Sequence, residues 1–256
     1  MIGPLGMLLA GTLLTACSES GSRGTPSTTP AGRTVSIVAL GDSVPRGTNC
    51  HCTSYPELTA ENLSATPDRK VTATNDSVDG YTTDSVLGQL TSHEGVIARV
   101  KGADAVEIEV GANDVPHSST CGTSLDCYTP DVPRMEKNLT AIVDRVHELT
   151  AGHAVLVVLL DYWSVWLGGA YATEQGQAYV ATAQKLTDDI NTAIKSVAVQ
   201  SGSAYVDLRA AFKGPDYTYD ETHYLSDDGE HPNEAGHKQI ATAATDVIES
   251  TGRPQG

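Results

Sequence analysis

The chain is poor in positive charge and has no long hydrophobic run in its body. Lys and Arg number 16 against 32 Asp and Glu, so the formal net charge of the 256 residues is −16. Such an acidic surface repels phosphate backbones and anionic membranes, and we expect no nucleic-acid partner. No apolar run in the body is long enough to predict a membrane-spanning helix. Because G-x-G-x-x-G and Walker patterns are also missing, we expect no nucleotide and no other cofactor.

The N-terminus differs from the body, because residues 1–17 are typical of an export signal. The stretch "IGPLGMLLAGTLLTA" is apolar and ends at Cys17, although no Lys or Arg precedes it. "LLTACSES" resembles a bacterial lipoprotein signal, in which Cys17 would carry the lipid. Residues 18–33 are rich in Ser, Gly, Thr and Pro and predict a flexible tether. We therefore expect a bacterial exported protein, lipid-anchored to the cell envelope or secreted, whose folded domain is 34–256.

Four further cysteines, Cys50, Cys52, Cys121 and Cys127, lie within this domain. An even number in an exported chain predicts two disulfides, but the sequence does not choose among the three possible pairings. The alternative is a metal site that includes His51 of "NCHC". Its C-x-C spacing differs from the usual C-x2-C zinc pattern, so disulfides are the favoured interpretation.

Short apolar runs alternate with longer amphipathic segments along the body. The runs are rich in Val and Ile, and two are nearly continuous, as in strands buried on both faces. The expected strands are 34–40, 71–75, 105–110, 153–162 and 203–208, and the expected helices include 135–150, 183–199 and 233–250. This alternation predicts βαβ units and a parallel sheet covered on both sides. With no internal repeat and no second linker, we expect one domain and a monomer.

Ligands bind beyond the carboxyl ends of the strands in such a sheet. Ser43 follows the first strand directly, Gly80 follows the second and Asn113 follows the third, while His231 lies in a loop near the C-terminus. A serine nucleophile needs an adjacent base such as histidine, a carboxylate to orient that base, and N–H donors for the oxyanion. These residue types together indicate acyl transfer.

The carboxylate is the least certain member, because D-x-x-H occurs at Asp114/His117, Asp144/His147, Asp220/His223 and Asp228/His231. In a helical turn this spacing puts both side chains on one face. We favour Asp228/His231 because a helix can start at Pro232, directly after the pair. Asp220/His223 stays an alternative.

Four segments resemble, in order, the four blocks of the SGNH or GDSL hydrolases. They are "ALGDSVPRG", the glycine of "DGYTT", "VGANDV" and "DDGEHPNEAGH", and together they cover nearly the whole folded part. The resemblance implies a three-layer α/β/α sandwich with a five-stranded parallel sheet. It also implies a serine esterase or lipase that acts on lipid, small or acylated-sugar esters.

Carried over residue by residue, the resemblance makes Ser43 the nucleophile, His231 the base and Asp228 its partner. The oxyanion would be bound by the backbone N–H groups of Ser43 and Gly80 and by the Asn113 amide. Each residue also has a plain structural interpretation: a helix cap for Ser43, turn residues for Gly80 and Asn113, and solvated loop residues for Asp228 and His231.

Other interpretations of the chain stay open. The neighbouring Asp42 is expected to be structural, and "DYWSVW" (161–166) is either an apolar wall of the site or core packing. The alternatives to a lipid or small-ester esterase are a carbohydrate O-acetylesterase on the same site, a non-catalytic binding lipoprotein, and a metal hydrolase.

Overall fold

A five-stranded parallel sheet forms the centre of the protein. The computed structural model describes residues 1, 3, 34–66 and 69–251. The strand order is β2-β1-β3-β4-β5, and every neighbouring pair is parallel. The strands are β1 (Val35–Gly41), β2 (Val71–Asn75), β3 (Ala105–Glu109), β4 (Leu156–Leu160) and β5 (Ala204–Val206). The predicted α/β class and strand count are confirmed.

Strand burial follows position in the sheet. The central strand β3 is buried along its whole length, and β1 and β4 each have a single half-buried residue. In the edge strand β2, by contrast, buried and half-buried residues alternate with exposed ones. The nearly continuous apolar runs of the sequence therefore correspond to strands that are covered on both faces.

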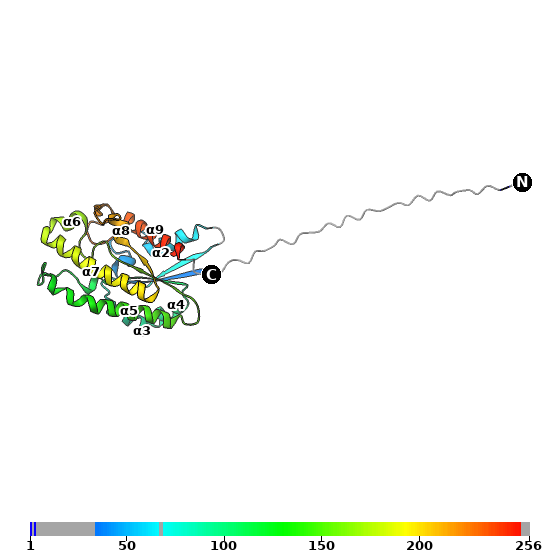
Figure 1. Cartoon of the computed structure of the whole chain (residues 1–256), viewed down its shortest axis with the longest axis horizontal. Helices are drawn as coiled ribbons and strands as arrows, with labels where there is room; N and C mark the ends of the chain where they lie inside the picture. Colours follow the sequence, from blue (N-terminus) through cyan, green and yellow to red (C-terminus); the bar gives the residue numbers. More distant parts are fainter. Residues whose placement is uncertain (2, 4–33, 67–68, 252–256) are drawn as a thin grey trace. The chain divides into compact units, whose positions relative to one another are not determined.

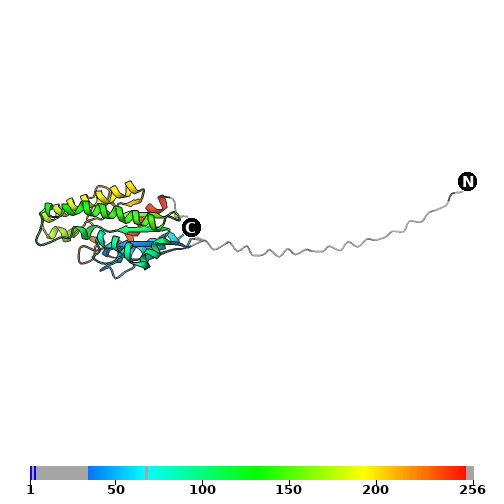
Figure 2. The same cartoon turned by 90° about the horizontal axis from the view of Figure 1, so that it is seen from below.

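Helices cover both faces of the sheet and complete the three-layer sandwich. One layer contains α2 and α9, with α8 packed against α9, and the other contains α3, α4, α5 and α7. Both views show α5 and α7 side by side (Figures 1 and 2). The helices are α1 (Ser43–Arg46), α2 (Tyr55–Ser64), α3 (Thr83–Ser92), α4 (Glu94–Lys101), α5 (Val132–Leu149), α6 (Gly169–Glu174), α7 (Gln177–Ser201), α8 (Leu208–Lys213) and α9 (Glu234–Ser250). Short 3-10 turns are η1 (Ala112–Asp114), η2 (Leu125–Cys127), η3 (Thr129–Asp131) and η4 (Thr222–Tyr224).

The amphipathic stripes predicted for α5 and α7 face the core. In α5 they bury Leu139, Ile142, Val143 and Val146, and in α7 they bury Leu186, Ile190, Ala193, Ile194 and Val197. The predicted start of the last helix at Pro232 is wrong by two residues. Asn233 caps α9 instead, because its side chain accepts hydrogen bonds from the N–H groups of Ala235 and Gly236. Pro232 forms a β-bridge with Leu225.

The predicted export signal apart from residues 1 and 3, Cys17 and the tether at 18–33 lie outside the described residues. They stay predictions. Within the described part of the chain, no helix combines the length and apolar character needed to cross a membrane.

The strand order places a reversal of the chain between β1 and β3. The strand that follows β1 in the sequence, β2, lies on one side of β1 in the sheet, and the next strand, β3, lies on the opposite side of β1. In doubly wound sheets this reversal leaves a crevice at the carboxyl ends of the two central strands, where ligands bind. Ser43 follows β1 and Asn113 follows β3, so both lie at this reversal point.

Gly41 ends β1 where the backbones of β1 and β3 meet. Its φ is +153°, and a Cβ built on it would lie 2.0 Å from the carbonyl oxygen of Glu109. The N–H of the next residue, Asp42, donates to that same carbonyl at 3.2 Å. Only glycine fits here, because the contact is with backbone, which cannot move aside as a flexible side chain can.

We predict that Gly41→Ala destabilises the fold by about 3 kcal/mol, since the new methyl group forces the two strands apart. Gly88→Ala is the matched control: Gly88 lies in α3, and a Cβ added there would meet no atom within 4 Å. It should stabilise by about 0.5–1 kcal/mol through helix propensity. Urea unfolding of both variants measures the two effects, and equal stabilities would contradict the close approach of the strands.

Candidate active site

Ser43 is the first residue of α1 and follows β1 by a single residue. The residue between them, Asp42, caps this helix by accepting a hydrogen bond from the Val44 N–H at 3.0 Å. Gly47, in a left-handed conformation, ends α1 after four residues. The cap is therefore Asp42 rather than Ser43, and the Ser43 hydroxyl is not used for helix capping.

Asp42 is held inside the protein. Its side chain is buried and also accepts a hydrogen bond from the Tyr162 hydroxyl at 2.7 Å. Burial raises the pKa of Asp42 to about 6, while the bonds from Tyr162 and Val44 oppose that rise. Its two oxygens bind different segments of the chain where β1 ends, which agrees with the structural role expected from the sequence.

Ser43, Asn113 and His231 line one small hollow of 20 Å³. They come from the loops after β1 and β3 and from the loop before α9. The remaining lining residues are Asp42, Val44, Ala112, Tyr162, Trp163, Ser164, Val165 and Glu230. The fold thus brings together three of the residues that the sequence singled out, although 188 positions separate Ser43 from His231.

Asp228 contacts His231 directly. Its Oδ2 lies 2.7 Å from Nδ1 of the imidazole, and its Oδ1 accepts the N–H groups of Glu230 and His231, each at 3.0 Å. These bonds close a turn, so the helical turn expected from the D-x-x-H spacing is wrong while the side-chain pairing is present. The paired Nδ1 leaves the other ring nitrogen, Nε2, for a second partner.

Asn49 is a further contact of this carboxylate that the sequence analysis missed. It lies in the loop after α1, and its Nδ2 donates to Asp228 Oδ2 at 2.5 Å. Partial burial raises the pKa of Asp228, but the hydrogen bonds from the backbone of His231 and Glu230 and from Asn49 outweigh it and lower the pKa to about 2. The carboxylate is therefore ionised throughout the neutral range.

The other D-x-x-H pairs do not form such a contact among the described residues. Asp220 instead accepts hydrogen bonds from the N–H and hydroxyl groups of Thr222, and the His223 ring packs on Tyr224 at 3.8 Å. Asp114 accepts hydrogen bonds from the N–H and hydroxyl groups of Thr83. Asp144 and His147 are exposed on α5. Of the four pairs, Asp228/His231 is the one whose carboxylate contacts its imidazole among the described residues.

Gly80 and Asn113 lie in adjoining loops, but only Asn113 lines the hollow. Asn113 Nδ2 donates to the Tyr81 carbonyl at 3.1 Å, which holds the loop after β2 against the loop after β3. An amide nitrogen carries two N–H groups, so one donor remains for a ligand. Gly80 is exposed and has a φ of +74°, as its interpretation as a turn residue predicts. Its role as an oxyanion donor stays a prediction.

The aromatic residues after β4 are mainly packing residues. Tyr162, Trp163 and Trp166 are each at most 3% exposed. Trp163 stacks on Phe212 with ring centroids 4.4 Å apart, and Trp166 Nε1 donates to the Val115 carbonyl at 2.7 Å. Of the two interpretations of this segment, core packing describes it better, although Trp163 also borders the hollow.

Both cysteine pairs are local. Cys50 is bonded to Cys52 in the loop after α1, and Cys121 is bonded to Cys127 in the loop after β3. Of the three possible pairings, the structure has the one that joins neighbours in the sequence. His51 does not join the candidate metal-ligand groups of the described residues, and the imidazole near the Cys50 and Cys52 sulfurs belongs to His237.

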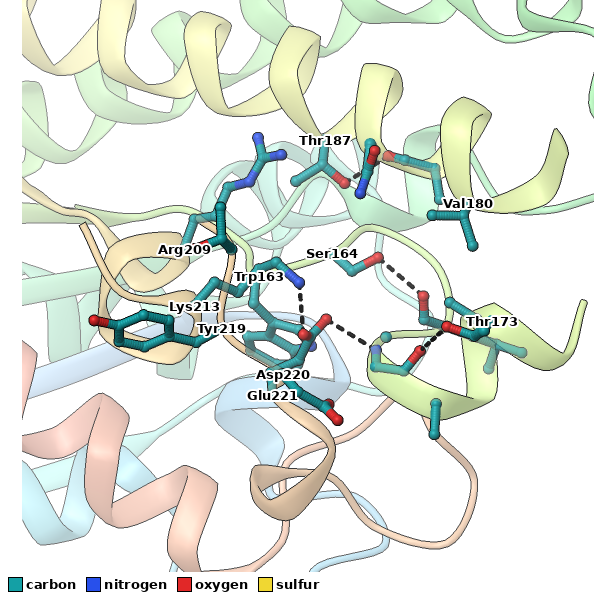
Figure 3. A pocket seen from close by; sticks show the side chains of 18 of the residues that line it. Trp163, Ser164, Thr173, Val180, Thr187, Arg209, Lys213, Tyr219, Asp220 and Glu221 are labelled. Carbon is teal, nitrogen blue, oxygen red and sulfur yellow. Dashed lines mark hydrogen bonds and ion pairs between the residues drawn. The ribbon is translucent and has the colours of Figure 1, made fainter. Parts of the chain in front are cut away.

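A second, larger pocket has a volume of 560 Å³ (Figure 3). The two cavities share Trp163 and Ser164 as lining residues. The lining of the pocket mixes apolar with polar and charged side chains, among them Leu167, Val180, Thr173, Gln184, Arg209 and Glu221. Lys213 Nζ pairs with Glu221 Oε2 at 2.5 Å, and Glu221 also accepts the Gly169 N–H at 2.9 Å, which fixes one side of the pocket.

Solved structures share this fold. The lipase Lip_vut3 from a goat rumen metagenome is 20% identical, with a TM-score of 0.66 over 85% of this chain and 97% of that one. The acetylxylan esterase Axe2 from Geobacillus stearothermophilus is 22% identical, with a TM-score of 0.61 over 87% and 96%. TesA is 18% identical, with a TM-score of 0.59 over 84% and 98%.

A search of curated proteins found no match. The model of the GDSL-like lipase/acylhydrolase family, however, matches residues 39–239, which include every residue placed in or beside the hollow. This range covers most of the chain and confirms the resemblance seen in the sequence. The protein belongs to the GDSL-like lipase/acylhydrolase family and is a carboxylic ester hydrolase.

Proposed function

We propose that the protein is a serine esterase in which Ser43, His231 and Asp228 form the catalytic triad. The observation that carries the proposal is the hydrogen bond between Asp228 and His231 at the border of the hollow that also contains Ser43. A carboxylate on Nδ1 fixes the tautomer in which Nε2 accepts a proton, as a general base requires.

In the proposed reaction, His231 Nε2 takes the hydroxyl proton while Ser43 Oγ attacks the ester carbonyl. The carbonyl oxygen becomes an oxyanion, which the free N–H of the Asn113 amide and the backbone N–H groups of Ser43 and Gly80 would stabilise. His231 then protonates the departing alcohol and leaves an acyl group on Ser43. Water attacks this acyl-enzyme with His231 again as base, releasing the acid. Ionised Asp228 stabilises the imidazolium in both halves.

The sizes of the two cavities favour a small acyl group on a larger alcohol. The hollow at Ser43 has only 20 Å³, little more than one water molecule needs. The neighbouring pocket of 560 Å³ has a mixed polar and apolar lining, which suits an alcohol with several hydroxyl groups better than a bare hydrocarbon chain. Within the esterase proposal, this observation favours the O-acetylated carbohydrate over the long-chain lipid.

We infer that the chain is exported and held at the cell envelope through Cys17, or secreted after cleavage. The apolar run that ends at Cys17 and the polar stretch 18–33 support this proposal. Mass spectrometry of the mature N-terminus tests it: a diacylglyceryl group on Cys17 supports anchoring, and an unmodified N-terminus after cleavage supports secretion.

The triad predicts one activated serine. A fluorophosphonate should form a single adduct that maps to Ser43 and is absent in Ser43→Ala. Ester turnover should fall by roughly 10⁴- to 10⁶-fold in Ser43→Ala and in His231→Ala, because nucleophile and base are needed together for attack on the ester carbonyl. Ser92→Ala, at an exposed serine of α3, is the control and should keep full activity. A folded protein without an adduct would support the non-catalytic binding lipoprotein instead.

Asn49 is predicted to act through Asp228 as a positioning residue. Its hydrogen bond favours the ionised carboxylate, so Asn49→Ala should raise the pKa of Asp228 from about 2 toward its ordinary value. At pH 3 the variant would then carry more protonated Asp228 than the wild type. We expect kcat to fall roughly 10-fold with little change in KM, because Asn49 does not line the hollow.

Carboxyl-carbon NMR titration measures the pKa, and steady-state kinetics separate kcat from KM. Thr48→Ala is the matched control, because Thr48 lies in the same loop but donates to Asp79 rather than to Asp228. An unchanged Asp228 pKa in Asn49→Ala, or an equal change in both variants, would contradict the positioning role.

The cavity sizes predict selectivity for short acyl groups. For a series of nitrophenyl esters, kcat/KM should be at least about 10-fold higher for acetate than for octanoate, since the hollow lacks room for the longer chain. Val180→Phe, which narrows the larger pocket, should weaken turnover of acetylated xylo-oligosaccharide and leave nitrophenyl acetate unaffected. Ala181→Phe puts the same ring on the exposed side of α7 and should change neither. Preference for octanoate would favour a lipid ester.

A further inference from the structure

The Cys50–Cys52 pair lies beside a buried histidine of the opposite end of the chain. The Sγ atoms of Cys50 and Cys52 and a ring nitrogen of His237 all lie within 4.8 Å of one another. Cys50 and Cys52 are half-buried in the loop after α1, and His237 lies in the first turns of α9. This group is separate from the hollow that contains Ser43 and does not depend on the proposed ester hydrolysis.

His237 lacks the hydrogen bonds that a buried imidazole normally forms. Its side chain is 0% exposed, and neither ring nitrogen has a hydrogen-bond partner among the described residues. Its ring stacks against Tyr55 with centroids 6.4 Å apart, which packs one face but satisfies no polar atom. Because an unpaired buried polar group destabilises the fold, a histidine in this position beside two sulfurs points to a ligand.

We propose that reduction of the Cys50–Cys52 disulfide creates a zinc site formed by Cys50, Cys52 and His237. A dithiol or phosphine reductant supplies two electrons, and with two protons the S–S bond becomes two thiols while the reductant is oxidised. Zn²⁺ then displaces the two thiol protons and forms two Zn–S bonds and one Zn–N bond, with no change in its own oxidation state. Water completes the fourth position.

The donor set and its dimensions suit zinc. Two thiolates and an imidazole are typical zinc ligands, and their bond lengths put neighbouring ligand atoms of a tetrahedral ion roughly 3.3–3.8 Å apart. The His237 nitrogen lies within 4.8 Å of both sulfurs, so it needs about 1 Å of adjustment. The two sulfurs, joined in the disulfide, must move apart by roughly 1.5–2 Å once the loop loses its cross-link. The local pair Cys121/Cys127 has no such histidine or carboxylate neighbour within the same reach among the described residues, so it offers an internal comparison.

The proposed metal site is next in sequence to a residue that contacts the proposed triad. Asn49, which bonds Asp228, directly precedes Cys50, and both Asn49 and His51 have left-handed backbones with φ of 60° and 53°. The disulfide cross-links this short loop directly after Asn49. Reduction without metal would release Asn49 from Asp228, and zinc would hold the loop again. This consequence rests on the proposed function, whereas metal binding itself does not.

Cobalt binding tests the site without reference to activity. The full-length protein is reduced anaerobically with a phosphine and titrated with Co²⁺, whose thiolate charge-transfer and tetrahedral ligand-field bands report the ligands. We expect one Co²⁺ per chain, displaced by Zn²⁺, in the reduced protein and none in the oxidised protein. Cys50→Ser/Cys52→Ser should abolish the bands, and Cys121→Ser/Cys127→Ser, the matched control, should keep them.

His237 is tested by His237→Asn, which should weaken Zn²⁺ binding more than about 100-fold, measured against a chromophoric chelator. If this variant does not fold, Cys52→Ser gives the equivalent loss of one ligand. The proposal is overturned if the reduced wild type gives no cobalt bands. It is equally overturned if the bands survive in Cys50→Ser/Cys52→Ser, or if folded His237→Asn binds Zn²⁺ as tightly as the wild type.

Discussion

The close approach of β1 and β3 at Gly41 is the constraint on which the rest of the site depends. Gly41 is paired with Glu109 in the register of the two strands, and no side chain fits between Gly41 and the Glu109 carbonyl. The next residue, Asp42, is then fixed by the N–H of Val44 and the hydroxyl of Tyr162. Ser43 is thereby presented at the start of a helix of only four residues, next to the loop that carries Asn113.

Two carboxylates beside this hollow have opposite electrostatic environments. Asp42 is buried, which raises its pKa to about 6, whereas Asp228 accepts several hydrogen bonds that lower its pKa to about 2. In the proposed triad, the carboxylate that must stay charged beside an imidazolium is the one surrounded by donors. In a chain with a net charge of −16, neighbouring acidic groups would otherwise favour protonation of either one. The difference in pKa between the two carboxylates therefore follows from burial and local hydrogen bonds rather than from the sequence motif.

The sequence was sufficient for the features that depend on local pattern. Continuous Val- and Ile-rich runs predicted the buried strands, and turn residues after β1 predicted the position of Ser43. Features made by contacts between distant segments were not predictable. Asn49 and Asp228 are 179 residues apart, and nothing in either segment indicates their hydrogen bond. D-x-x-H spacing occurred four times, and the sequence could not show that Asp228 and His231 are the pair in contact. The turn around Asp228 was missed because its backbone bonds replace the expected helix.

The loop between α1 and α2 has one feature that the sequence predicted and others that only the fold shows. Its C-x-C spacing is visible in the sequence and predicted a cross-link or a metal site, with His51 as the nearest imidazole. In the structure, the imidazole near the two sulfurs belongs to His237 and not to His51. The reason is that α9 packs against α2 and brings the buried ring of His237 to the sulfurs. The same loop holds Asn49 against Asp228. A short segment that resembles an ordinary surface loop therefore lies between a core histidine whose ring nitrogens have no hydrogen-bond partner among the described residues and the carboxylate of the proposed triad. Under the proposed reduction, the state of its cross-link would change how firmly Asn49 holds that carboxylate.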